Sequence, residues 1–318
     1  MKIEPASVVL AMILVACGAP AARAALTYTT IDHPLAGAGG TVPYAVDGTR
    51  IVGTYFDSNR SSHGFLYDGT NWTTLDAPNA SGAGGTAAYG VSDGTICGTY
   101  VTATGQTLGF LYDGVNWTTL DHPPAGLGQV DTFARGVSGS TVVGYYIQSL
   151  VARGFVYQNG TYTDLIVPGA TGTFPRDVDG TRVVGAFEDL LGTHGFLTDG
   201  AIPIVLDHPL GLLLGTFANG VDGADVVGNY LSLDDGQSHG FLYDGTSYIP
   251  VDFPGATSTT ANGIDGGRIV GSYVDAAGAT HGFVAAVPEP AASAALLTLT
   301  AALTRRRRGA PPAVRPAR

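Results

Sequence analysis

The long middle section of the sequence has very little positive charge. Lys2 is the only lysine among 318 residues, and only seven of the 14 arginines lie between residues 25 and 287. The same stretch carries 23 aspartates and Glu188, so its net charge is −17. Such a surface repels phosphate backbones. The composition therefore argues against nucleic acid as a partner.

Cysteine is also scarce, because Cys17 and Cys97 are the only two. If Cys17 leaves with an N-terminal leader, Cys97 has no partner in the chain and no intramolecular disulfide can form. The sequence also lacks the spacing of a zinc site and a phosphate-binding glycine loop. We therefore expect no catalytic residue, cofactor or metal ligand. Weak calcium binding at the acidic stretches 177–180 and 234–236 stays open, since neither has regular calcium-loop spacing.

Glycine, by contrast, is abundant, with 47 residues and no collagen-like period, and 45% of the chain is apolar. This composition is typical of a folded, turn-rich β-protein. The glycines also mark an internal repeat of 41 to 45 residues. A Gly-Phe pair begins at Gly64, Gly109, Gly154, Gly195, Gly240 and Gly282. A second glycine, always after two residues that are Ile, Val or Cys, recurs at Gly53, Gly98, Gly144, Gly185, Gly228 and Gly271.

Each repeat predicts four short strands, which we name a to d in chain order. In the first copy, strand a ends at Val46, strand b spans 51–55, strand c spans 63–67 and strand d spans 72–76. Asp-Gly pairs close the a–b and c–d hairpins, as two-residue hairpin turns require. Cys97 stands where every other copy has valine, which indicates a buried apolar thiol.

The d strands decide the architecture. Five of them follow the first five c strands, but the sixth c strand, at 281–284, is followed by none. The segment 27–32 instead reads as a d strand with no c strand before it. We therefore predict an all-β, six-bladed β-propeller over residues 25–286, closed by the N-terminal strand pairing in the last blade. Pro203 and Pro250 fall inside predicted d strands, which places strand d at the outer edge.

Both ends of the chain predict export. Residues 1–24 are typical of a signal peptide, with cleavage between Ala24 and Ala25. Lipidation of Cys17, within a stretch that resembles a lipobox, remains an alternative.

The C-terminal segment 287–308 combines a short motif, an apolar run at 291–303 and a basic cluster, and the basic tail 309–318 is expected to be disordered. An apolar helix of 13 residues spans ~20 Å, which is short of the ~30 Å hydrocarbon core and favours transient membrane contact. The segment resembles a PEP-CTERM sorting signal. That resemblance implies a Gram-negative source, processing by an exosortase and delivery to the cell envelope or extracellular matrix. The residues that carry it are Pro288, Glu289, Pro290, Arg305, Arg306, Arg307 and Arg308.

The repeats themselves resemble the extracellular HAF family, named for a His-Ala-Phe tripeptide. Four copies here carry His-Gly-Phe, beginning at His63, His194, His239 and His281, while Leu108 and Arg153 replace the histidine in the other two. The resemblance covers residues 26–286 and implies an extracellular protein, with no particular reaction.

No singular active site emerges from the repeats. All seven histidines occupy repeated positions, which favours structural roles over catalysis. The stretch 90–94 matches Gly-x-Ser-x-Gly, but it falls on an a–b hairpin rather than the strand-to-helix turn that a nucleophile needs. Repeated aromatic residues in strand d could pack between blades or stack on sugars. These are Tyr28, Trp72, Trp117, Tyr162 and Tyr248.

We therefore expect a non-catalytic interaction or scaffold module of the envelope or exopolysaccharide matrix, with a polysaccharide or envelope component as the possible partner. A carbohydrate-binding propeller is the first alternative. A propeller glycosidase or lyase is the second, and carboxylates that converge from different blades on the central axis would favour it.

Overall fold

The computed structural model describes residues 26–81, 85–123, 129–211 and 215–287. The predicted leader, the sorting motif from Pro288 onward and the basic tail lie outside these ranges. Every regular element within them is a β-strand. No helix in the described ranges is long and apolar enough to cross a membrane. The apolar run at 291–303, which we interpret as a transient anchor, lies outside the described residues.

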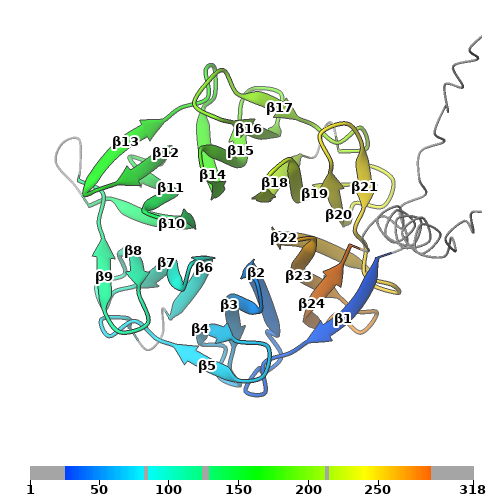
Figure 1. Ribbon diagram of the computed structural model, residues 1–318, viewed down its shortest axis with the longest axis horizontal. Coiled ribbons are helices and arrows are strands. Elements are labelled where there is room, and N and C mark those ends of the chain that lie inside the picture. Colours follow the sequence, from blue (N-terminus) through cyan, green and yellow to red (C-terminus); the bar gives the residue numbers. More distant parts are fainter. Residues whose placement is uncertain (1–25, 82–84, 124–128, 212–214, 288–318) are drawn as a thin grey trace, which may run out of the picture. The chain divides into compact units, whose positions relative to one another are not determined.

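Twenty-four strands form six antiparallel sheets of four around a central axis (Figure 1). Blade 1 consists of β2 (Thr41–Asp47), β3 (Arg50–Phe56), β4 (Ser62–Tyr67) and β5 (Trp72–Leu75). Blade 2 consists of β6 (Thr86–Ser92), β7 (Thr95–Val101), β8 (Thr107–Tyr112) and β9 (Trp117–Leu120). Blade 3 consists of β10 (Asp131–Ser138), β11 (Thr141–Gln148), β12 (Val151–Gln158) and β13 (Thr161–Leu165). Blade 4 consists of β14 (Gly172–Asp179), β15 (Arg182–Glu188), β16 (Thr193–Thr198) and β17 (Ile204–Leu206). Blade 5 consists of β18 (Thr216–Asp222), β19 (Asp225–Leu231), β20 (Ser238–Tyr243) and β21 (Tyr248–Pro250). Blade 6 consists of β22 (Ser258–Asp265), β23 (Arg268–Val274), β24 (Thr280–Ala286) and β1 (Thr27–Ile31).

The predicted closure is confirmed. Strand β1 pairs antiparallel with β24, in a register that runs from Thr27 opposite Ala286 to Ile31 opposite Gly282. The residue after β1 adds a side-chain link, because Asp32 lies 2.8 Å from Nδ1 of His281. The two ends of the propeller are therefore held in one sheet, which removes an open edge from the ring.

The order of strands within a blade is also as predicted. Strand a is innermost, strand d is outermost, and Figure 1 shows β2, β6, β10, β14, β18 and β22 around the axis. Pro250 is the last residue of β21, but Pro203 lies just before β17, so its predicted place inside a strand was wrong. Proline has no N–H for the ladder, and pairing with β16 starts only at Ile204, opposite Leu197.

The two glycine markers of the repeat belong to one contact. In blade 1 the glycine of strand b, Gly53, pairs opposite Phe65 of strand c. A Cβ on Gly53 would come within 2.7 Å of the Phe65 ring and 2.2 Å of the Val42 carbonyl oxygen. The six phenylalanines of the Gly-Phe pairs are among the largest fully buried side chains, and they are Phe65, Phe110, Phe155, Phe196, Phe241 and Phe283. The repeat period therefore records a packed aromatic core in every blade.

Buried threonines fix the crossing from each blade to the next. The hydroxyl oxygen of Thr41 accepts a hydrogen bond from the backbone N–H of His33, at 2.9 Å. The same contact recurs at Thr86, Thr132, Thr173, Thr216 and Thr259. All six threonines are at most 3% exposed, so each satisfies a buried backbone donor and sets where the next inner strand begins. Cys97 is buried as predicted, and burial raises the pKa of its thiol.

Candidate functional site

Each inner strand contains a β-bulge, and the bulged residues meet on the axis. In blade 1 the register shifts between Pro43 and Ala45, which leaves Tyr44 without a partner in β3. The equivalent shift occurs in every blade, and a bulge re-aims a side chain that regular alternation would direct elsewhere. These residues, which we call the bulge ring, are Tyr44, Tyr89, Arg135, Arg176, Asn219 and Asn262, and they line a cavity of about 50 Å³.

Aromatic contacts join the first three members of the bulge ring. The rings of Tyr44 and Tyr89 lie 4.6 Å apart. The guanidinium carbon of Arg135 lies 3.9 Å from the centre of the Tyr89 ring, in a cation–π contact. Arg135 also donates a hydrogen bond from Nη2 to the hydroxyl of Tyr145, at 3.0 Å.

Hydrogen bonds join the opposite side of the ring. Arg176 donates from Nη1 to the side-chain oxygen of Asn219, at 3.1 Å. Asn219 donates to the carbonyl oxygen of Ala261 at 2.9 Å, and Asn262 donates to that of Pro43 at 2.8 Å. Neighbouring blades are thus linked through the bulge ring from blade 4 to blade 1.

Arg135 and Arg176 differ from the other neighbouring pairs of the bulge ring, because both residues are positively charged. Burial and then the charge of Arg135 lower the pKa of Arg176 to about 10. Nε of Arg135 is buried without a hydrogen-bond partner. Within the described part of the chain, neither guanidinium has a carboxylate within ion-pair distance. Both arginines remain partly open to solvent, so their guanidinium groups can bind an anion.

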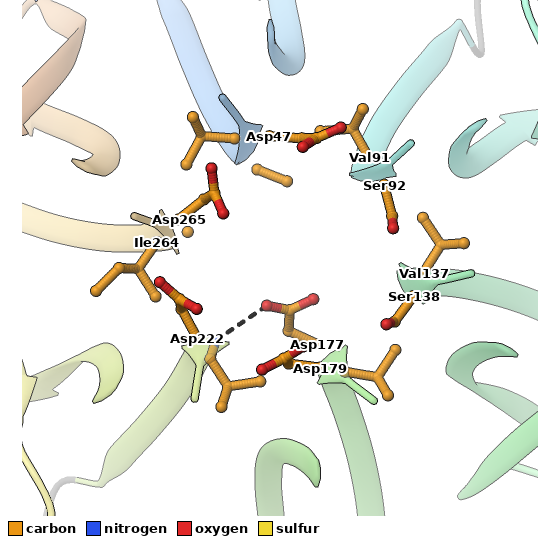
Figure 2. Close-up of a pocket in the computed structure, with 15 residues that line it drawn as sticks. Asp47, Val91, Ser92, Val137, Ser138, Asp177, Asp179, Asp222, Ile264 and Asp265 are labelled. Carbon is orange, nitrogen blue, oxygen red and sulfur yellow. Dashed lines mark hydrogen bonds between the residues drawn. The ribbon is translucent and has the colours of Figure 1, made fainter. Parts of the chain in front are cut away.

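The end of the channel beside the a–b hairpins is acidic. Figure 2 shows the turn residues Asp47, Asp179, Asp222, Asp265, Ser92 and Ser138 around a cavity of about 100 Å³. These carboxylates come from different blades, which is the arrangement that favours an enzyme. Most of these turn residues, however, bond the backbone of the next blade. Asp265, Ser92, Ser138, Asp179 and Asp222 accept hydrogen bonds from the N–H groups of Gly48, Gly139, Gly180, Gly223 and Gly266, at 2.7 to 3.4 Å.

Asp177 also lines the cavity at the acidic end, and its surroundings differ from those of the turn residues. It occupies a position where the other blades have glycine or alanine, and it points into the same cavity (Figure 2). Burial raises the pKa of Asp177 to about 7, although its carboxylate accepts a 3.0 Å hydrogen bond from the N–H of Val221. A carboxyl group with this pKa can gain and lose a proton near neutral pH.

The histidines fall into two structural classes. His33, His122 and His208 stack on tyrosines of the following blade, with ring centres 3.7 to 3.8 Å apart, and burial lowers the pKa of each. The other four each bridge an aspartate after strand d and one in the b–c loop, and they are His63, His194, His239 and His281. Each class serves the contact between elements, and neither gathers at one pocket.

Other residues considered at the sequence level also lie in structural settings. Ser92 ends β6 at its hairpin with β7, as expected for the 90–94 stretch. Trp72 packs against Phe65 and Tyr67 of its own blade, with ring centres 5.1 and 4.5 Å away, and belongs to the hydrophobic cluster at the interface with blade 6, rather than standing free as a stacking platform. Asp235 of the second acidic stretch bonds His239. Nowhere in the described ranges do three or more His, Cys, Asp or Glu side chains gather as metal ligands.

The bulge ring was not identified from the sequence. The sequence does contain a signal, at the position two residues before the last apolar residue of strand a. This position is tyrosine in blades 1 and 2, arginine in blades 3 and 4, and asparagine in blades 5 and 6. Periodicity alone did not reveal that this position faces the axis, since the bulge breaks the alternation of the strand.

No family model matches this chain, and no curated protein matches it. Among solved structures, it is similar to a mutant of the Aleuria aurantia lectin in complex with α-methyl-L-fucoside, with 15% identity, a TM-score of 0.48, and coverage of 77% of this chain and 90% of the lectin. It is similar to the β-propeller domain of the Trilobed protease from Pyrococcus furiosus, with 11% identity, a TM-score of 0.48, and coverage of 82% and 92%. It is also similar to Trypanosoma rangeli sialidase in complex with sialic acid, with 10% identity, a TM-score of 0.48, and coverage of 88% and 60%. At these identities the likeness concerns the propeller fold, and it assigns neither a ligand nor an activity to this chain.

Proposed function

We propose that this chain is an exported, non-catalytic binding propeller of the cell envelope or extracellular matrix, and that it binds single carboxylate groups of an acidic polysaccharide at a local positive site, although the net charge of −17 over residues 25–287 repels polyanions at longer range. The proposal rests on one observation about Arg135 and Arg176. Their two guanidinium groups share a cavity, and neither has a carboxylate partner in the described part of the chain. A carboxylate accepts hydrogen bonds from such groups in the geometry that arginine favours.

The size of the axial cavities supports binding over catalysis. They measure about 50 and 100 Å³. Pockets that enclose a small-molecule substrate usually measure roughly 300–1,000 Å³. The smaller cavity, which the bulge ring lines and which we call the arginine cavity, has room for the charged group of a sugar, while the sugar ring stays outside. The aromatic side chains beside the arginines, Phe133 and Phe217, offer surfaces for that ring, at 5.9 and 5.2 Å from the guanidinium carbons.

Affinity for a carboxylated polymer tests this proposal directly. The purified propeller should bind polygalacturonate, and binding should weaken as salt rises, because the contact is between charges. Dextran, a neutral polymer, serves as the control. If the protein binds both polymers equally, or neither of them, or releases oligosaccharides from polygalacturonate, the proposal is wrong.

Export and sorting are part of the same proposal, and they rest on the two ends of the sequence. Cleavage after Ala24 and removal of the tail near Pro288, Glu289 and Pro290 would leave the propeller with little else attached. Mass spectrometry of the protein from culture fractions measures both ends. A mature chain that begins at Ala25, lacks Arg305–Arg308 and occurs outside the inner membrane is expected. A chain that begins at Cys17 with an attached lipid would establish the alternative.

An enzyme is the second candidate, and Asp177 is the observation that favours it. A carboxyl group with a pKa of about 7 beside other carboxylates suits general acid–base chemistry. Asp177→Asn would then abolish turnover of a polysaccharide substrate while leaving the fold intact. A panel of polysaccharide substrates without any product formation would exclude this candidate for those substrates.

A further inference from the structure

The interface between blades 3 and 4 contains a cleft of about 690 Å³, which is much larger than either axial cavity. Its floor is formed by Val156 and Leu165 of blade 3 and by Val178 and Val183 of blade 4. The volume falls within the roughly 300–1,000 Å³ that is usual for ligand pockets, and the floor is apolar.

The equivalent space is filled at the interface between blades 6 and 1. There Val284 and Ile31 of blade 6 correspond to Val156 and Leu165, and Val46 and Ile51 of blade 1 correspond to Val178 and Val183. Two aromatic side chains, Tyr67 and Trp72, belong to the same hydrophobic cluster as these four residues. Their rings lie 4.5 Å apart and occupy the place that is open between blades 3 and 4.

Other blades repeat the aromatic filling. Blades 2, 3 and 5 carry the pairs Tyr112–Trp117, Tyr157–Tyr162 and Tyr243–Tyr248, with ring centres 4.6 to 4.9 Å apart. Blade 6 has Tyr28 beside Ala285. Blade 4 has neither aromatic, because Thr198 stands at the strand c position and Pro203 at the strand d position.

The rim of the cleft carries two exposed isoleucines among polar residues such as Gln158 and Asp199. Ile202, next to Pro203, is 87% exposed, and Ile166 at the end of strand d of blade 3 is 52% exposed. Both line the cleft, so exposed apolar side chains from two blades stand at its rim. Contiguous exposed apolar residues around a cleft are typical of an interaction site.

We propose that the cleft between blades 3 and 4 receives a tryptophan or tyrosine side chain of a partner polypeptide. The occupant follows from the molecule itself, because at equivalent interfaces the same apolar walls are filled by aromatic side chains carried on a polypeptide strand. The partner's aromatic residue takes the place of the pair that blade 4 lacks. This site is distinct from the arginine cavity on the axis, so it stands or falls separately from the proposed binding of acidic polysaccharide.

The probe for this site is N-acetyl-tryptophan amide, which presents one indole side chain on a peptide unit. Titration by NMR should show saturable binding to the propeller, with a dissociation constant of about a millimolar, as expected for a single buried side chain. N-acetyl-leucine amide, which is apolar but not planar, should bind at least about threefold more weakly. Absence of saturable binding, or equal binding of the two amides, overturns the proposal.

Filling the cleft supplies the decisive comparison. The double variant Thr198→Tyr/Pro203→Trp restores the aromatic pair of the other blades, and it should weaken binding of the tryptophan amide at least about tenfold and raise Tm by a few degrees. Thr198→Tyr alone is the milder variant if the double variant does not fold. Arg135→Ala/Arg176→Ala leaves the cleft intact and should keep the affinity for the amide. If either filled variant folds and binds the amide as tightly as the natural chain, the cleft is not the site.

Discussion

The axial channel is acidic at its hairpin end and carries positive charge at the bulge ring, which lies midway along the inner strands, and the two regions use their charges differently. At the hairpin end, aspartate and serine side chains accept hydrogen bonds from backbone N–H groups of neighbouring blades. In the bulge ring, Arg135 and Arg176 have polar and aromatic neighbours but no carboxylate partner in the described residues. The acidic hairpin end therefore carries the structural bonds, and the bulge ring, which has fewer charges, carries the candidate binding site.

The number of charges at a site therefore does not indicate whether the site stabilises the fold or binds a ligand. A carboxylate that accepts a backbone hydrogen bond is already satisfied, whereas a partly buried guanidinium without a counter-charge gains most from a ligand. Four predictions follow from the comparison between the hairpin end and the bulge ring.

The largest effect is expected from removing the arginines. Arg135→Ala/Arg176→Ala should weaken binding of polygalacturonate by roughly 100-fold, because charge-assisted hydrogen bonds contribute about 1.5–3 kcal/mol each. The stability of the unliganded protein should change less than binding does, because relief of the repulsion between two like charges opposes the loss of the contacts to Tyr89, Tyr145 and Asn219. Isothermal titration at fixed salt measures the first effect and urea unfolding the second. Arg50→Ala, at an exposed hairpin position, is the control and should bind as the natural chain does.

The acidic end should respond in the opposite way. Asp222→Ala leaves the N–H of Gly266 without its acceptor and should lower the free energy of unfolding by about 1–2 kcal/mol. Binding of polygalacturonate should not change. Asp222→Asn keeps an acceptor oxygen and should lose less stability than the alanine variant. A loss of binding in Asp222→Ala without a loss of stability would mean that the hairpin end and the bulge ring do not have separate roles.

Asp177 should make the free energy of unfolding depend on pH. Its pKa in the folded protein is about 7, against 3.8 in an unfolded chain, so the folded state holds the proton more tightly. Its contribution to stability is fully present below about pH 4 and is lost as pH rises toward 7. Because the carboxyl group is partly open to the channel, we expect a change of about 1 kcal/mol across this range. In Asp177→Asn this fall should disappear, and urea unfolding at a series of pH values measures it.

The smallest effect is expected at the serine members of the acidic end. Ser92→Ala removes a neutral and long hydrogen bond, 3.4 Å to the N–H of Gly139, and should cost at most about 0.5 kcal/mol. Comparison with Asp222→Ala shows how much more a charged acceptor contributes to the free energy of unfolding than a neutral one. Equal losses in the two variants would show that charge does not strengthen these contacts.

Most of the fold could be predicted from the sequence. The hairpins around Asp47 and Asp68 are local features, and the spacing of Gly53 and Phe65 reflects a contact across one hairpin. The closure followed from counting, because an unpaired d strand at one end matched a missing one at the other. Pro203 was placed wrongly because one hydrogen bond decides where a short edge strand begins.

The candidate sites could not be predicted in the same way. The bulge that turns Arg135 and Arg176 toward the axis depends on how the inner strand pairs with its neighbour. The cleft between blades 3 and 4 depends on comparing what fills the same space at each interface, which requires knowing which faces meet. The substitutions Thr198 and Pro203 were visible in the sequence, but the space that they leave was not.

Short-range patterns of turns, glycines and apolar residues in the chain specify the sixfold β repeat, the strand order and the pairing of its two ends. Which charges are satisfied and which are not depends instead on how the blades pack together in three dimensions. The bonds of Asp222 and Asp179 to the next blade join residues 44 positions apart, and the two arginines of the ring come from different blades. Such contacts are set by the lateral packing of whole sheets, which no local pattern in the chain specifies.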